Sequence, residues 1–141
     1  MRIRSLKLER FRGARSLSLD LDESLNVFVG VNGAGKSTVL DATAILLSWL
    51  ANRIRRSGAS GRPIIEADIT NGEASANLEI VAEHGGAPFD WSVSKIRRGR
   101  EVKGISSLLA GASEAAERII QLLRHERSGQ RRPCLLQRIK N

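Results

Sequence analysis

The residues with the clearest chemical role form one short stretch, in which glycines precede a lysine and two hydroxyl side chains. It matches the pattern G-x-x-x-x-G-K-[ST] at every fixed position. The glycines let the backbone curl so that successive N–H groups point inward, toward phosphate oxygens. Lys36 supplies positive charge for the β- and γ-phosphates, and Ser37 offers a hydroxyl to Mg²⁺. The pattern predicts a nucleoside triphosphate site made of Gly30, Val31, Asn32, Gly33, Ala34, Gly35, Lys36, Ser37 and Thr38.

The elements on either side of this loop have the order that the pattern requires. Residues 25–29 are a short apolar run that ends directly at Gly30, which indicates a buried parallel strand. From Ser37 to about Arg53 the sequence fits one helix, apolar on nearly every face, as is typical of a helix packed on a sheet. The free N–H groups at the start of that helix would face the same anion. A glycine-rich turn with an incidental lysine is the alternative, and the strand, loop and helix order argues against it.

The residues before the loop predict an antiparallel pair of strands. Apolar and polar side chains alternate from Ile3 to Arg10, but Ile3 falls out of register, so we expect an irregularity near Ser5. Residues 11–13 are typical of a turn. A second, half-exposed strand is then indicated by leucine at three alternate positions, namely Leu17, Leu19 and Leu21.

The first 50 residues resemble the start of RecF- and SMC-type ATPases. The resemblance rests on a strand that ends in Phe11-Arg12, a second short strand, and residues 26–38 with Asn-Gly inside the loop. Arg10 departs from it, because many members have Asn before Phe-Arg. These are the ABC-type head domains of DNA-repair, chromosome-organising and phage-defence proteins, the last including OLD and Septu ATPases. The resemblance implies a P-loop NTPase of the α/β class with a mixed sheet and an antiparallel β-meander.

The same resemblance implies ATP and Mg²⁺ as cofactors and assigns further roles near the phosphates. Asn32 would lie near the γ-phosphate, and Arg12 would approach the phosphates from the amino-terminal hairpin. A second head domain or a partner subunit would close the site, and DNA is kept as a partner.

The sequence after the helix predicts a loop and then a meander. Residues 53–63 are rich in Gly, Ser and Arg without periodicity, which favours a loop. Its arginines at 53, 55 and 56 either face nucleic acid or favour the carboxyl end of the helix dipole. Strand-like alternation over residues 64–97 predicts three antiparallel strands, with Asn71-Gly72 as a hairpin signal. Trp91 is expected in the core rather than stacked on a base, and His84 is expected in a turn without a metal.

The last part of the chain predicts one helix and a basic tail. Apolar residues at helical spacing over 105–125 indicate an amphipathic helix, which Gly111 should weaken by about 1 kcal/mol relative to Ala. Residues 127–141 are basic, and from Ser128 the chain is expected to be disordered. The predicted organisation is one partial head domain over 1–126, with residues 1–50, 64–97 and 105–125 as its parts, followed by the tail.

Composition and charge limit the classes of protein to which the chain can belong. The 141 residues suffice for one domain with a core. The net charge is +8, of which residues 124–141 contribute +5, so a basic patch and a solvated charged face stay open as alternatives. No stretch reaches the roughly 18 apolar residues of a membrane span, and the amino terminus lacks a signal-peptide core. The single Cys134 has no disulfide partner. These features predict a cytoplasmic protein.

Motifs needed for hydrolysis are not found in the sequence. An ABC-type head also needs an acidic residue at the end of a second apolar strand, which holds Mg²⁺, and a neighbour that activates water. The sequence has neither such a strand nor a Ser-Gly-Gly-Gln type signature; residues 17–23 and 128–130 come closest. If the chain nevertheless hydrolysed ATP, the carboxylates to test first would be those of Glu66, Asp68 and Glu79.

Two functional classes follow from these motifs. The first is an ATP-binding module of a RecF/SMC-like ATPase in DNA repair, DNA processing or phage defence, unable to hydrolyse ATP alone. The second is a non-catalytic nucleotide-binding interaction protein, in which ATP only orders the fold and exposes a partner surface.

Overall fold

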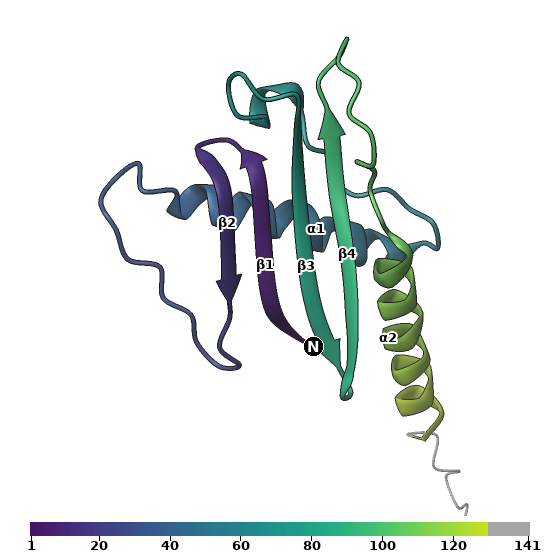
Figure 1. The fold of residues 1–141 in the computed structure, drawn as a ribbon. Helices are drawn as coiled ribbons and strands as arrows, with labels where there is room; N and C mark the ends of the chain where they lie inside the picture. Colours follow the sequence, from purple (N-terminus) through teal and green to yellow (C-terminus); the bar gives the residue numbers. More distant parts are fainter. Residues whose placement is uncertain (130–141) are drawn as a thin grey trace, which may run out of the picture.

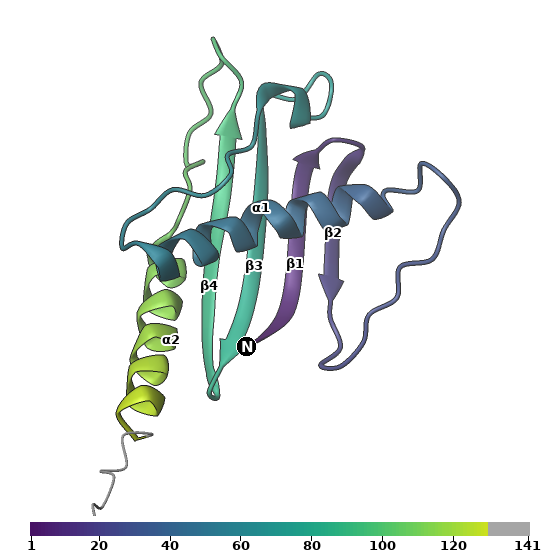
Figure 2. The same cartoon turned by 180° about the vertical axis from the view of Figure 1, so that it is seen from behind.

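The computed structural model describes residues 1–129 as one antiparallel sheet with a helix across one face and a second helix at one edge (Figure 1). The elements in chain order are β1 (Arg2–Phe11), β2 (Ala14–Asp20), α1 (Lys36–Arg55), the 3₁₀ turn η1 (Glu66–Asp68), β3 (Ser75–His84), β4 (Ala87–Ile96) and α2 (Ala110–Gly129). Seen from behind, α1 crosses the sheet at a steep angle to the strands (Figure 2). None of the helices in this described part is long and apolar enough to cross a membrane.

The sheet has the strand order β2-β1-β3-β4, and every neighbouring pair is antiparallel. Leu6 and Leu8 of β1 lie opposite Ile80 and Leu78 of β3, and all four are buried. Their alternation with polar residues turns one face of the sheet into the core. The predicted β1–β2 hairpin is confirmed, and so is the irregularity near Ser5, where the pairing of β1 with β3 shifts register.

The helix α1 closes the core against this apolar face. Its buried residues recur at helical spacing: Val39, Ala42, Ile45, Leu46 and Leu50. Trp91 of β4 is 1% exposed, and its indole N–H donates to the carbonyl oxygen of Leu46 at 3.0 Å. The predicted helix and the core position of Trp91 are therefore confirmed.

The helix α2 packs beside β4 and differs in its bounds from the prediction of 105–125. It begins at Ala110, because Leu108 is still paired with Ser92 of β4 through both backbone groups. It continues to Gly129, so residues 127–129 of the predicted tail are helical. The rest of that predicted tail lies outside the described residues. Gly111 lets the helix approach β4 closely, because a Cβ atom there would lie 1.8 Å from the carbonyl oxygen of Asp90.

The prediction of a strand over residues 64–70 is wrong, whereas the β3–β4 hairpin is confirmed. Residues 66–68 form η1, and only Ile69 makes an isolated bridge, to Phe11. The competing interaction is local, since a carboxylate oxygen of Asp68 accepts from the N–H of Ile65 at 3.2 Å. Residues 71–72 do form a turn, and Gly72 has a φ of +85°, but this turn does not join two strands.

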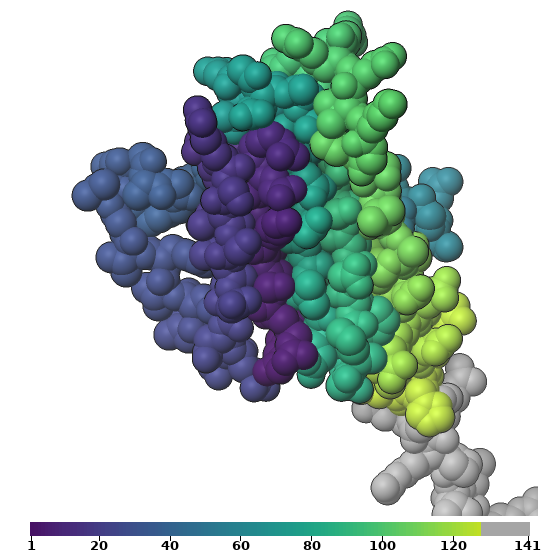
Figure 3. Space-filling view, viewed as in Figure 1, coloured from purple at the N-terminus to yellow at the C-terminus, as the bar shows by residue number. Residues whose placement is uncertain are grey.

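The predicted buried strand over residues 25–29 is also wrong. These residues form no ladder with any strand of the described chain, and Leu25, Val27 and Val29 are 74%, 70% and 90% exposed. Apolar side chains favour a buried strand only where neighbouring strands pair with its backbone. The described sheet is therefore wholly antiparallel rather than mixed. Figure 3 shows this segment standing away from the body of the molecule beside β2.

Candidate nucleotide-binding site

The loop between β2 and α1 has the backbone curl that the glycine pattern predicts. Gly33 and Gly35 both have a φ of +87°, a conformation that side chains with a Cβ atom rarely adopt. Gly35 caps the helix, and the N–H of Val39 donates to its carbonyl oxygen at 3.1 Å. The free N–H groups of the first turn of α1 therefore begin directly at Lys36.

A cavity of about 580 Å³ lies between this loop and the β1–β2 hairpin. One wall is the hairpin, through Gly13, Ala14, Ser16 and Leu17; the other is the loop, through Asn32, Gly33, Ala34, Gly35, Lys36, Ser37 and Thr38. Cavities of this size are typical of small-molecule sites. The structure thus brings seven of the nine predicted loop residues to one cavity, while Gly30 and Val31 do not line it.

The ammonium group of Lys36 is held inside the loop. Its Nζ donates to the carbonyl oxygens of Gly30 and, at 2.8 Å, Val31. An ammonium group has three donors, so these two bonds leave one donor for a ligand. Gly30 and Val31 thus serve the site by orienting the lysine. Residues 30–34 of the loop are exposed and Lys36 is half-buried, so a solvated phosphate chain can reach the loop.

The structure places Arg12 beside the cavity but does not direct it into the cavity. Its guanidinium binds the carboxylates of Asp41 in α1 and, through Nε at 3.0 Å, Asp68 in η1. Arg12 does not line the cavity, whereas the next residue, Gly13, does. The hydrogen bond with Asp41 is the main reason that the pKa of Arg12 is raised above its ordinary value. A phosphate contact by Arg12 stays a prediction.

The donor set of the cavity fits phosphate well and Mg²⁺ in part. Backbone N–H groups, Lys36 and the helix start suit an anion. For a metal ion the lining offers the hydroxyl of Ser37, which would hold Mg²⁺ in a triphosphate complex and let the metal neutralise phosphate charge. None of the described lining residues is acidic, and residues 1–129 contain no cluster of metal-binding side chains.

The three carboxylates singled out for a test of hydrolysis do not line this cavity. Asp68 is bound to Arg12, and Glu66 accepts from the backbone N–H of Arg98 at 2.9 Å. Glu79 lies on β3 and accepts from the amide of Asn77 at 3.1 Å. Each therefore has a structural partner away from the phosphate loop.

Among the three clustered arginines of the helix end, Arg53 has a structural role. It donates to the carbonyl oxygen of Leu109 at 2.6 Å and to the hydroxyl of Ser113 at 2.7 Å, and it stacks over the ring of Trp49. It thereby joins α1 to the start of α2. The sequence left two roles open for these arginines, nucleic-acid binding or stabilisation of the helix end. The contacts of Arg53 favour the role without nucleic acid.

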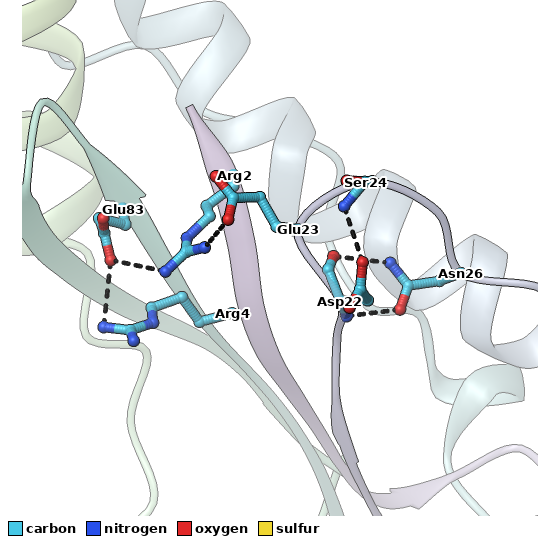
Figure 4. Close-up of polar contacts among 7 residues, drawn as sticks. All are labelled: Arg2, Arg4, Asp22, Glu23, Ser24, Asn26 and Glu83. Atoms are coloured by element: carbon cyan, nitrogen blue, oxygen red, sulfur yellow. Dashed lines mark hydrogen bonds and ion pairs between the residues drawn. The ribbon is translucent and has the colours of Figure 1, made fainter.

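Polar contacts fix the start of the segment that leads from β2 to the loop (Figure 4). Asp22 and Asn26 exchange two hydrogen bonds, and a carboxylate oxygen of Asp22 accepts from the N–H of Ser24 at 2.9 Å. Glu23 pairs with Arg2 of β1 at 2.9 Å. These contacts hold residues 22–26 as a turn, although exposed ion pairs of this kind contribute little free energy.

Sequence reasoning missed the second wall of the cavity and both partners of Arg12. Gly13, Ala14 and Ser16 carry no motif, so only the folded hairpin shows their role. Asp41 could have been predicted to lie near the site, because it is one helical turn after Ser37 and therefore on the same side of α1.

Comparisons with known proteins place this chain in the AAA domain family. A profile of the AAA domain family matches residues 5–140. The chain is 29% identical to the Retron Ec83 probable ATPase of Escherichia coli over 109 residues, which is 76% of this chain and 20% of the relative. It is 32% identical to the DNA replication and repair protein RecF of Rhodococcus erythropolis over 121 residues, which is 81% of this chain and 29% of the relative.

The fold has a counterpart among solved structures. A structure described under ATP-driven dimerization and DNA-stimulated activation of SMC ATPases matches with a TM-score of 0.55 and 18% identity, over 83% of this chain and 80% of that chain. This match shows a P-loop NTPase fold and confirms the predicted α/β class. The chain spans less than a third of the length of the two curated relatives.

Proposed function

The chain belongs to the AAA domain family and is of the RecF/SMC type, and we propose that it is the ATP-binding module of such an ATPase, with Mg-ATP bound at residues 30–38. The observation that carries the proposal is the glycine-curled loop at the start of α1, facing a cavity of about 580 Å³. Lys36 pairs with the β- and γ-phosphates, and Ser37 holds the metal. Asn32, which lines the cavity, contributes to the discrimination of ATP from ADP.

The module needs a second component for hydrolysis. The described lining of the cavity contains no carboxylate that could hold the metal or orient water. Apolar side chains of residues 25–31 are also exposed, in a segment with the composition of a buried strand. A second head domain or partner subunit that packs on this side would both pair the segment and supply the acidic residue.

The biological setting is proposed from the relatives. One of them is a DNA replication and repair protein, and another is the probable ATPase of a retron. They support DNA as a partner and a role in DNA repair, DNA processing or phage defence in the cytoplasm. The alternative is a nucleotide-binding interaction protein without catalysis, in which the exposed residues 25–31 recruit a partner after ATP binds.

The test is equilibrium binding of Mg-ATP to the purified chain and to Lys36→Ala. Losing a charge-assisted contact costs roughly 1.5–3 kcal/mol, so the variant should bind ATP roughly 10 to 150 times more weakly. Lys103→Ala is the matched control, because it removes an exposed lysine from a loop that does not line the cavity. Equal ATP affinity of Lys36→Ala and the control would refute the proposed site.

A further inference from the structure

We infer that Arg12 is a positioning residue of the nucleotide site: its ion pairs with Asp41 and Asp68 hold the β1–β2 turn against α1 and so fix the wall of the cavity. The inference rests on the proposed function and adds how that site is shaped. It differs from the role that the family resemblance gives to Arg12, which is direct contact with phosphate.

The guanidinium joins three elements that are far apart in the sequence. Arg12 follows β1, Asp41 lies in α1 and Asp68 lies in η1. The side chain of Asp68 is only 8% exposed, whereas that of Asp41 is 39% exposed. A buried carboxylate bound by a guanidinium is costly to leave unpaired, so Asp68 anchors the arginine. Asp41 then connects this anchor to the helix that begins at the phosphate loop.

The backbone around Arg12 is fixed by the same neighbours. Its N–H donates to the carbonyl oxygen of Asp68 at 2.6 Å, and its own carbonyl oxygen accepts from the hydroxyl of Thr70 at 2.6 Å. Arg10 and Arg12 have φ values of +53° and +52°, which residues other than glycine rarely adopt. Such a conformation persists where the surroundings determine it from several sides.

The wall of the cavity begins at the next residue. Gly13, Ala14 and Ser16 line it, so any movement of the Arg12 backbone changes the distance between this wall and the phosphate loop. Arg12 itself does not line the cavity. The guanidinium gives its Nε to Asp68 and one terminal nitrogen to Asp41, so two carboxylates fix its orientation outside the cavity lining, which makes the positioning role the better fit to these contacts.

The two roles predict opposite results for Asp41→Asn. If Arg12 bound phosphate, removing the competing carboxylate would leave ATP affinity unchanged or raise it. In the positioning role, Asp41→Asn and Arg12→Ala both weaken ATP binding, by about 3- to 10-fold, within the range typical of indirect effects. The double variant should bind ATP no more weakly than Arg12→Ala alone, because both single changes break the same Arg12–Asp41 ion pair.

The experiment measures Mg-ATP affinity of the wild type and these three variants, below the melting temperature of each. Arg4→Ala is the matched control, because it breaks a comparable ion pair of β1, with Glu83 at 3.1 Å, at the opposite end of the strand. Asp41→Asn avoids the buried Asp68, whose replacement could prevent folding. Unchanged or tighter ATP binding by Asp41→Asn, or additive losses in the double variant, would overturn the inference.

A second readout separates this inference from the proposed function. Amide hydrogen exchange of residues 13–17 without nucleotide should be faster in Arg12→Ala and Asp41→Asn than in Arg4→Ala. If the wild type failed to bind ATP while this exchange pattern held, the proposed function would fail and the positioning of the turn would stand. Equal exchange in all three variants would overturn the positioning role itself.

Discussion

Ser37 is the residue through which the loop would contact the metal rather than the phosphates. It lies in the first turn of α1 and lines the cavity. Ser37→Ala should weaken ATP binding in the presence of Mg²⁺ by about tenfold, the effect of one lost charge-assisted contact, and should leave binding in EDTA nearly unchanged. The measurement is ATP affinity with and without Mg²⁺. Ser37→Thr is the control, because it keeps the hydroxyl; an equal loss in both media would argue against a metal contact.

A sequence pattern can predict that neighbouring residues share a site, but it cannot predict contacts between residues far apart in the chain. The residues from Asn32 to Thr38 could be predicted to meet at one site because they are neighbours in the chain and the glycines fix their geometry. The contacts of Arg12 could not, because Asp41 and Asp68 lie 29 and 56 positions away. Only the folded positions of α1 and η1 bring these carboxylates to one guanidinium.

At the scale of elements, the close approach of α2 to β4 depends on Gly111. Gly111→Ala should remove roughly 1 kcal/mol of helix-propensity cost, but its Cβ atom would meet the carbonyl oxygen of Asp90. Overpacking of this kind costs roughly 1–3 kcal/mol, so we expect a lower melting temperature. Thermal unfolding measures it, with the exposed Glu117→Ala on the same helix as control. A melting temperature equal to or above that of the wild type would contradict the packing role.

The strands were predictable to different degrees for a physical reason. In β1 and β3 the alternation of leucine or isoleucine with polar residues corresponds to a paired strand with one buried face. Residues 64–70 alternate equally well, yet the Asp68 carboxylate accepts from the N–H of Ile65 and a 3₁₀ turn forms. Periodicity reports which side chains favour burial, and it does not report which backbone will find a partner.

At the scale of the whole molecule, the exposed segment at residues 25–31 and the cavity lie on the same side. Leu25, Val27, Val29 and Val31 are all at least 70% exposed, and they directly precede the loop residues that line the cavity. Apolar side chains gathered in this way favour association. This side of the molecule is therefore where a partner would be expected both to pack and to reach the bound phosphates.

These features predict that the 141-residue chain binds Mg-ATP but hydrolyses it negligibly. Lys36 and the loop N–H groups can stabilise phosphate charge, but water must also be oriented and the metal fully held. Two of the carboxylates singled out from the sequence, Glu66 and Asp68, are engaged elsewhere in the fold. Two copies of the chain would bring the same residues, so raising the protein concentration should not restore activity.

The measurement is phosphate release from Mg-ATP by the purified chain over a range of protein concentrations, with Lys36→Ala in parallel. Contaminating ATPases would act equally in both preparations, so only the difference between them belongs to this site. Turnover near the common enzyme range of about 1 s⁻¹ or faster, lost in Lys36→Ala, would contradict the prediction. It would mean that a carboxylate approaches the cavity after nucleotide binds, and Glu66→Gln, Asp68→Asn and Glu79→Gln would identify which one.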